Sequence, residues 1–191
     1  MSRLDDAELV QPKSRAVLRR WLTKHHDTSP GVWIVSFTKA SGKPRLDYED
    51  IVLELLCFGC VDSTARKIDA ERSAIYCAPR KKGGTWAATN KARIKQLEAE
   101  GLMTPAGRAV ITQAKRDGSW TILDGVEALE VPDDLAAAFK QHPDAAARYE
   151  SLGKSAKKQV LWSVISAKRP KTRATRVERV IQRAGDGESL P

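Results

Sequence analysis

Strand-like segments in this chain are confined to residues 32–78, and every segment after Gly84 has a helical pattern. Residues 32–38 read VWIVSFT, which is rich in β-branched and aromatic residues and predicts a strand buried on both faces. Residues 61–68 and 73–78, separated by a turn near residues 69–71, predict a hairpin that joins the first strand. The order of elements predicts an α+β protein. We expect a small antiparallel sheet of about three strands packed with helices, followed by a helical, basic C-terminal part.

Capping residues and apolar periodicity predict the helices. Ser14 and Asp47 each precede an amphipathic run, and Thr104-Pro105 combines a cap with a first-turn proline. Further helices are expected over residues 85–100, 132–139, 143–152, 155–168 and 172–184. A composition shift at residues 117–132 predicts an α+β core over 14–116 and a helical region over 132–184. We expect the second region to dock on the first or to form a single domain with it.

The positive charge of the chain is concentrated near its C-terminus. The formal net charge is +9, and residues 154–183 alone hold ten Lys or Arg against one acid, Glu178. Such a segment attracts polyanions, including nucleic acid and acidic lipid, although a solvated basic face that keeps the protein soluble has the same composition. We single out Lys168, Arg169, Arg173 and Arg176 as a candidate polyanion-binding surface.

Other bulk features favour a cytoplasmic protein without membrane insertion. The first fifteen residues contain acids and no apolar stretch of the kind found in secretory signals, and no apolar run approaches the length of a membrane span. Three cysteines, an odd number, do not predict a disulfide framework. The oligomeric state is not predicted.

The stretch from Ala78 to Arg93, APRKKGGTWAATNKAR, is the clearest candidate binding element. Three cations at residues 80–82 meet a Gly83-Gly84 turn, and a helix is expected to start with Thr85 as its cap and Trp86 at its first position. Because helix N-termini carry unpaired N–H groups and a partial positive charge, a basic glycine turn that feeds one is a candidate anion site. An ordinary strand-to-helix turn explains the glycines equally well.

Two further groups of residues are candidates for the same site. In a regular strand Asp62, Thr64 and Arg66 point to one face, where the carboxylate and guanidinium either form a structural salt bridge or line a polar pocket. Trp86, Asn90 and Arg93 share one helical face, which serves either recognition or an interhelical contact. The predicted ligand-binding set is therefore Asp62, Arg66, Arg80, Lys81, Trp86, Asn90 and Arg93.

No motif in the sequence indicates catalysis, a metal or a cofactor. Cys57 and Cys60 form a CxxC at the end of a predicted helix, where the dipole raises rather than lowers a thiol pKa, and no second paired motif supplies zinc ligands. Nucleophile elbows, HExxH and phosphate loops are missing from the sequence. We therefore expect no metal, no cofactor and no catalytic residue.

Several spaced motifs resemble the YdeI/OmpD-associated family, also labelled OmdA-like or bacteriocin-protection proteins. The resemblance spans roughly residues 14–183 and departs from the family pattern at Cys60, where Trp is typical, and at Tyr76, where a polar or basic residue is common. The motifs that carry it are Cys57-Phe58-Gly59, Val61-Asp62-Ser63, Pro79-Arg80-Lys81 with Trp86 and Asn90, Met103-Thr104-Pro105-Ala106-Gly107, Val131-Pro132-Asp133-Asp134-Leu135, and Ala167-Lys168-Arg169-Pro170 with Thr172-Arg173 and Arg176.

The resemblance implies a bacterial protein with a role in stress or bacteriocin protection, and it implies no catalytic residue. Combined with the charge pattern, it favours a non-enzymatic protein that binds an anionic ligand or an acidic macromolecule. The alternatives are a nucleic-acid-binding protein that uses the basic C-terminal helices, a small-molecule enzyme with a pocket near Asp62 and Trp86, and an adaptor whose basic tail docks on an acidic protein.

Overall fold

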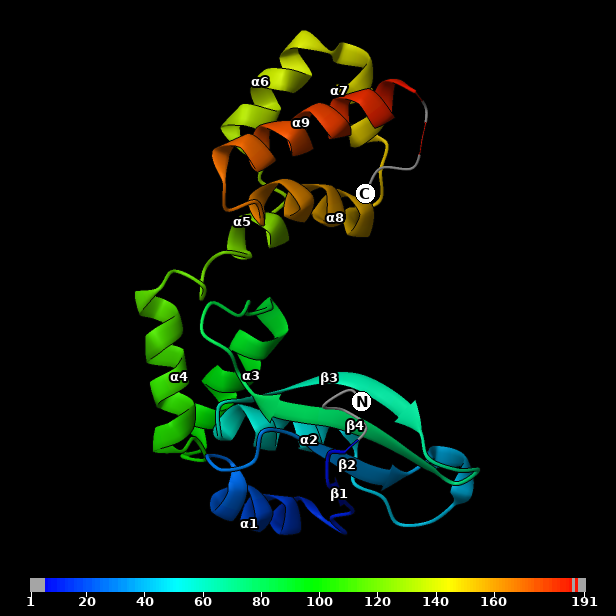
Figure 1. Cartoon of the computed structure of the whole chain (residues 1–191), viewed down its shortest axis with the longest axis vertical. Coiled ribbons are helices and arrows are strands. Elements are labelled where there is room, and N and C mark those ends of the chain that lie inside the picture. Colours follow the sequence, from blue (N-terminus) through cyan, green and yellow to red (C-terminus); the bar gives the residue numbers. More distant parts are fainter. Residues whose placement is uncertain (1–5, 187, 189–191) are drawn as a thin grey trace. The chain divides into compact units, whose positions relative to one another are not determined.

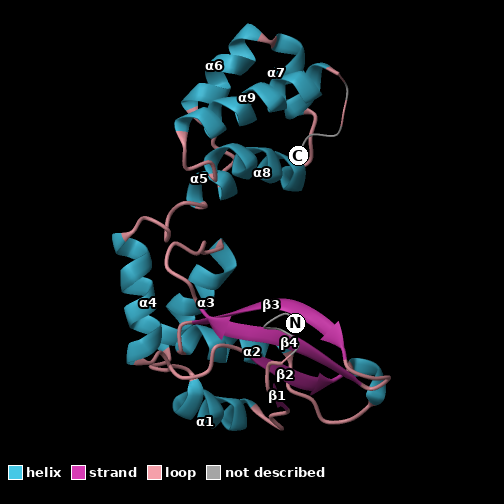
Figure 2. Cartoon of the chain, viewed as in Figure 1, coloured by secondary structure: helices cyan, strands magenta, loops and turns pink. Residues whose placement is uncertain are grey.

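The computed structural model describes residues 6–186 and residue 188, which fall into two compact units that divide between Ser119 and Trp120. The N-terminal unit holds the sheet, and the C-terminal unit is helical in its described residues (Figures 1 and 2). The chain is thus an α+β protein, as predicted.

The N-terminal unit alternates strands and helices before it ends in two helices. Its elements are β1 (Leu9–Val10), α1 (Arg15–His25), β2 (Val32–Phe37), the 3-10 helix η1 (Lys39–Ser41), α2 (Tyr48–Cys57), β3 (Cys60–Lys67), β4 (Arg72–Pro79), α3 (Ala88–Ala99) and α4 (Pro105–Arg116). The predicted hairpin of β3 and β4 and the predicted helices at Ser14, Asp47 and Thr104 are confirmed.

The sheet has four strands in the order β1-β2-β4-β3, one more than predicted. The added strand, β1, pairs in parallel with β2, while β2, β4 and β3 pair antiparallel, so the sheet is mixed rather than antiparallel. Two residues are too few to show an alternating pattern, which is why the sequence did not predict β1.

The two faces of the sheet bury different side chains. Trp33, Val35 and Ala74 form a buried cluster on one face. On the other, β3 contacts α2, whose residues from Ile51 to Cys57 are all buried. Helix α1 packs on α2 in turn through Leu18 and Leu22.

Helix α4 is fixed at its N-terminus against the C-terminal end of α2. The Thr104 hydroxyl donates to the Cys57 carbonyl at 2.6 Å and accepts from the Gly107 N–H, which caps the helix. A Cβ at Gly107 would lie 2.3 Å from the Cys57 carbonyl oxygen, so only glycine permits this approach. The contact sets the position of α4 beside the turn that follows β4.

The C-terminal unit consists of α5 (Asp124–Glu127), α6 (Asp133–Gln141), α7 (Pro143–Glu150), α8 (Lys154–Ile165) and α9 (Pro170–Gly185). Four of these were predicted, and the single-turn α5 was not. Its core is apolar and contains Leu135, Phe139, Tyr149, Val160 and Val180 among its buried members. Helix α9 contacts α6, α7 and α8, with Val180 and Ala184 buried and Val177 and Ile181 partly buried against the core of the unit.

Candidate functional site

A surface pocket of about 310 Å³ lies between the basic turn and α4. One wall is the turn itself, residues 80–84, together with Trp86. The other wall is α4 and the residues that follow it: Ala109, Val110, Gln113, Ala114, Asp117 and Ser119. The turn is anchored because the Arg80 N–H donates to the Gly59 carbonyl at 3.0 Å and the Gly84 N–H donates to the Lys81 carbonyl at 3.1 Å. Gly83 has φ +73°, a conformation that glycine adopts without strain.

Arg80 is the half-buried cation of this pocket. The carbon at the centre of its guanidinium lies 3.9 Å from the centroid of the Trp86 ring, and its Nη1 donates to the Thr85 carbonyl at 3.2 Å. Its Nε is buried and has no hydrogen-bond partner among the described residues. Burial lowers the pKa of the Arg80 guanidinium, and the nearby Asp62 carboxylate acts in the opposite direction. Since arginine stays protonated in proteins, the pocket wall holds a partly desolvated positive charge.

The other charged side chains that line the pocket are those of Lys81 and Lys82, which are donors, and the carboxylate of Asp117. Lys81 and Lys82 are exposed at the rim. The Asp117 carboxylate accepts hydrogen bonds from Ser119, from the Gly83 N–H and from the Gln113 amide, and these bonds lower the pKa of Asp117, with Ser119 as the largest cause. The backbone amide of Gly83 is therefore already bonded to Asp117. Arg80, Lys81 and Lys82 are the groups that can bind an external anion.

The predicted contribution of a helix N-terminus to this site is wrong. Helix α3 begins at Ala88, two residues later than expected, and its N-cap Ala87 makes no side-chain cap bond. Trp86 lies before the helix and is 2% exposed. Its indole is therefore buried from the non-helical segment that precedes α3. The pocket lining contains no residue of α3.

Three of the predicted site residues form a separate polar network between α2, β3 and α3. Tyr48 donates to the Asp62 carboxylate at 2.8 Å. Arg93 donates to both carboxylate oxygens of Glu49, at 2.7 and 2.6 Å, and to the Asn90 side-chain oxygen at 3.1 Å. The Glu49 bonds raise the pKa of Arg93 and lower that of Glu49. Asp62 acts on Arg80 through its charge but does not line the pocket.

The expectation that Asp62 and Arg66 share a face is wrong. Asp62 lies opposite Cys77 and Ala65 lies opposite Ile75, so β3 uses one residue more than β4 over this stretch. This bulge turns the residues after it to the other face. Arg66 consequently lies opposite Ala74 and stacks on Trp33, with its guanidinium carbon 3.9 Å from the ring centroid.

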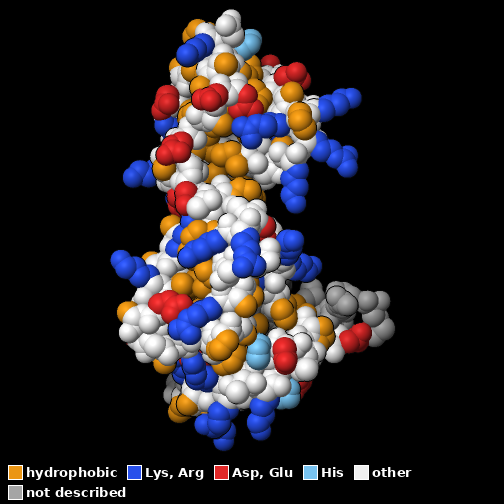
Figure 3. All heavy atoms as spheres, turned by 90° about the vertical axis from the view of Figure 1, so that its left-hand side faces the viewer, with side chains coloured by type: hydrophobic (Ala, Val, Ile, Leu, Met, Phe, Trp, Pro, Cys, Tyr) orange, Lys and Arg blue, Asp and Glu red, His pale blue; other side chains and the backbone are white. Residues whose placement is uncertain are grey.

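In the C-terminal unit, two of the four predicted polyanion contacts are engaged internally. Arg173 makes two hydrogen bonds to Asp134, at 2.6 and 2.9 Å. Arg176 donates to the Ser163 carbonyl at 2.6 Å and to the Ser166 hydroxyl at 2.8 Å. Lys168 and Arg169 are exposed. Figure 3 shows exposed Lys and Arg side chains on both units.

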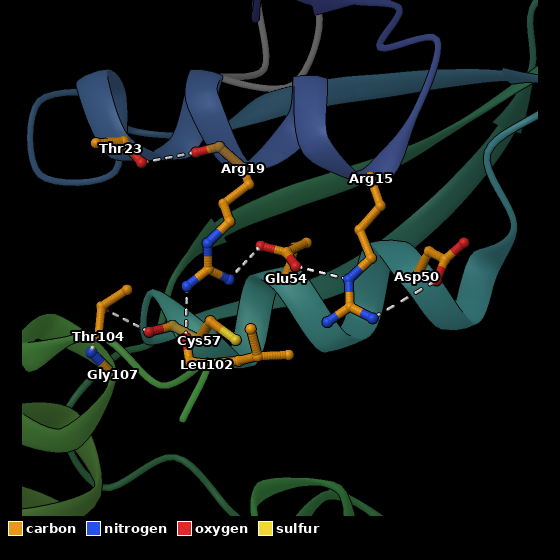
Figure 4. A network of polar contacts seen from close by, with 9 residues as sticks. All are labelled: Arg15, Arg19, Thr23, Asp50, Glu54, Cys57, Leu102, Thr104 and Gly107. Carbon is orange, nitrogen blue, oxygen red and sulfur yellow. Dashed lines mark hydrogen bonds and ion pairs between the residues drawn. The ribbon is translucent and has the colours of Figure 1, made fainter. Parts of the chain in front are cut away.

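Sequence reasoning missed a buried charge cluster around Glu54 (Figure 4). The Glu54 side chain is 2% exposed and accepts from Arg15 Nε at 2.7 Å and from Arg19 Nη1 at 2.9 Å. Arg19 also donates to the Leu102 carbonyl at 2.6 Å, which links α1, α2 and the loop before α4. The signal was present in the sequence: an acid inside the apolar run IVLELL, and two arginines four residues apart on the preceding helix.

The cysteines and the possible metal ligands do not form a second candidate site within the described residues. Cys57, Cys60 and Cys77 are buried free thiols, and burial raises the pKa of Cys60 to about 11. Within residues 6–186, groups of three or more His, Cys, Asp and Glu side chains that could hold a metal ion are not found. None of the helices in this range has both the length and the apolar character needed to cross a bilayer.

Two family models match the chain. Residues 10–110 match the family described as "Domain of unknown function (DUF8412)", and residues 128–187 match the family described as "Bacteriocin-protection, YdeI or OmpD-Associated". The chain therefore belongs to the first family over more than half of its length, and the predicted resemblance to the second is confirmed for its C-terminal region. The motif Pro79-Arg80-Lys81 with Trp86 lies in the region of unknown function. No curated protein and no solved structure matches the chain.

Proposed function

We propose that the N-terminal unit binds a small organic anion in the pocket between residues 80–86 and α4, and that binding rather than catalysis is its activity. The protein would act in the cytoplasm in stress or bacteriocin protection. The description of the family that residues 128–187 match supports the bacteriocin-protection part of this proposal.

The guanidinium of Arg80, which lines the pocket and stacks on Trp86, carries this proposal. A hydrogen bond between a charged donor and a charged acceptor contributes about 1.5–3 kcal/mol, and burial of the donor raises its value. Stacking on Trp86 holds the guanidinium in place, so little side-chain entropy is lost when an anion binds.

The other walls favour an organic body attached to the anionic group. Val110 and Ala114 of α4 and the Trp86 ring line the pocket with apolar atoms, while Lys81 and Lys82 stand at its rim. A volume of about 310 Å³ is at the lower end of the range for small-molecule sites. A carboxylate or phosphate monoester on a ring of modest size fits this combination.

The titratable lining supports binding rather than acid–base catalysis. The carboxylate in the lining, Asp117, has a lowered pKa and is held by hydrogen bonds from Ser119, Gly83 and Gln113. A general base functions best with a pKa near the working pH, and the pKa of this carboxylate is shifted away from neutral pH.

Calorimetric titration of the full chain with inorganic phosphate, benzoate and adenosine monophosphate tests the proposal. We expect at least one of the organic anions to bind, and Arg80→Gln to weaken its binding by about tenfold or more, since one charged hydrogen bond is lost. Lys95→Gln, which removes an exposed charge from α3 outside the pocket, is the matched control and should leave the affinity unchanged. Equal losses in both variants, or no probe binding more tightly than about 1 mM, would overturn the proposal.

A further inference from the structure

The C-terminal unit holds more positive charge than its own acids neutralise. Of the ten cations in residues 154–183, five are engaged internally: Lys157 with Glu150, Lys158 with Glu127, Arg173 with Asp134, Arg183 with Glu188, and Arg176 with two serines. The other five are Lys154, Lys168, Arg169, Lys171 and Arg179. All are exposed, and their side chains make no ion pair within the described part of the chain.

Four of these five cations lie on or beside one exposed face of α9. At 100° per residue, Lys171, Thr172 and Arg179 fall within about 60° of Thr175 on the helix surface. These four residues of α9 are exposed. Lys168 and Arg169, which are also exposed, lie just before the helix. From Lys171 to Arg179 the face extends about 12 Å. Glu178, the acid of this segment, lies at its edge.

We propose that this surface, the α9 face of Lys168, Arg169, Lys171, Thr172 and Arg179, binds the phosphate backbone of double-stranded nucleic acid. Lysine, arginine and hydroxyl side chains are the donors that contact phosphates in such complexes. Cations that lack internal partners release condensed counterions from the duplex when they bind, which supplies the free energy.

The composition of α9 disfavours the other polyanions. A helix that lies on a membrane inserts apolar side chains, and here Val177, Val180, Ile181 and Ala184 are packed inside the C-terminal unit. Single strands are bound by stacking on aromatic rings, and α9 contains none. Exposed charge without exposed large apolar or aromatic side chains on α9 fits the backbone of a duplex.

This surface replaces half of the set expected from the sequence. Arg173 and Arg176 were predicted contacts, but their donors are used by Asp134, Ser163 and Ser166. Lys171 and Arg179 take their place. The pocket beside Arg80 belongs to the N-terminal unit, so the two proposals stand independently.

Fluorescence anisotropy of the full chain with a labelled DNA duplex of about 20 base pairs, titrated between about 50 and 200 mM salt, tests the α9 face. We expect saturable binding whose logarithmic salt dependence has a slope of about −3 to −4, since roughly four cations contact phosphates. The double variant Lys171→Gln/Arg179→Gln should reduce the steepness of that slope by about two and weaken binding at every salt concentration.

Two variants make the result specific to this face. Lys24→Gln/Lys95→Gln removes the same charge from exposed sites of the N-terminal unit and should leave the slope unchanged. Lys171→Arg/Arg179→Lys keeps the charge and should bind like the unaltered protein. The proposal is overturned if the duplex does not bind at low salt, if both charge-removing variants lose the same affinity, or if phosphatidylserine vesicles bind more tightly than the duplex.

Discussion

Replacement of Glu54 by glutamine is predicted to destabilise the N-terminal unit strongly. The substitution keeps the size of the side chain and removes its charge, and the site is almost fully buried, with 2% of the side chain exposed. Two charge-assisted hydrogen bonds, from Arg15 and Arg19, are weakened together, and the Nη2 atom of Arg15 is already buried without a partner among the residues that the structure describes.

The expected loss is about 3 kcal/mol. Breaking a buried ion pair by removing one partner costs about 3–5 kcal/mol. The lower end applies because the arginine side chains are 31% and 32% exposed and regain some hydration. Against a typical total stability of about 5–15 kcal/mol, this is a large fraction.

Urea unfolding followed by circular dichroism measures the effect. With a slope of about 2 kcal/mol per molar urea, the unfolding midpoint should fall by about 1.5 M. Glu49→Gln is the matched control on the same helix, because its carboxylate also binds an arginine through two hydrogen bonds but is 53% exposed. Exposed pairs contribute at most about 1 kcal/mol, so its midpoint should fall by less than about 0.5 M. Equal shifts for the two variants would refute the reasoning that burial sets the cost.

Three further predictions follow from the structure. Asp117→Asn should strengthen anion binding at the pocket by roughly fivefold, because a competing negative charge is removed; unchanged or weaker binding in calorimetry would contradict this. Asp134→Asn should lower stability at neutral pH by less than about 1 kcal/mol and have no effect in acid. The bonds from Arg173 lower the folded-state pKa of Asp134, so the stability it gives is present above its ordinary pKa and is lost as the pH falls through the folded value; a difference in unfolding midpoint that persists at low pH would argue against it. The three buried cysteines should react slowly with a thiol-specific chromogenic reagent in the folded protein and fully in denaturant, since burial raises their pKa values; rapid reaction without denaturant would contradict their burial.

The sequence predicted those features that depend on local signals. Thr104-Pro105 and Ser14 mark helix starts through hydrogen bonds made within one turn, and the hairpin of β3 and β4 follows from its own side-chain pattern. The basic turn at residues 80–84 was singled out because its residues are contiguous, and the structure places them in the lining of a pocket; anion binding there stays a prediction.

The features that the sequence did not predict depend on contacts between residues that are distant in sequence. The bulge that turns Arg66 to the Trp33 face adds a single residue to β3, without a glycine to mark it. The delayed start of α3 reflects the burial of Trp86, and the partners of Arg173 and Arg176 lie on other helices. The α4 wall of the pocket could not be predicted for the same reason, since Gly107 and Cys57 are brought together only by folding.

A nuclear magnetic resonance titration tests the central claim, that Arg80 and the turn beside it bind a small organic anion. The full chain, labelled with ¹⁵N, is titrated with benzoate or adenosine monophosphate, whichever binds more tightly. The account predicts saturable shifts centred on the Gly84 amide, the Trp86 indole and the Gln113 side-chain amide, with loss of these shifts in Arg80→Gln. Shifts centred elsewhere, or the same shifts in the Arg80 variant, would contradict it.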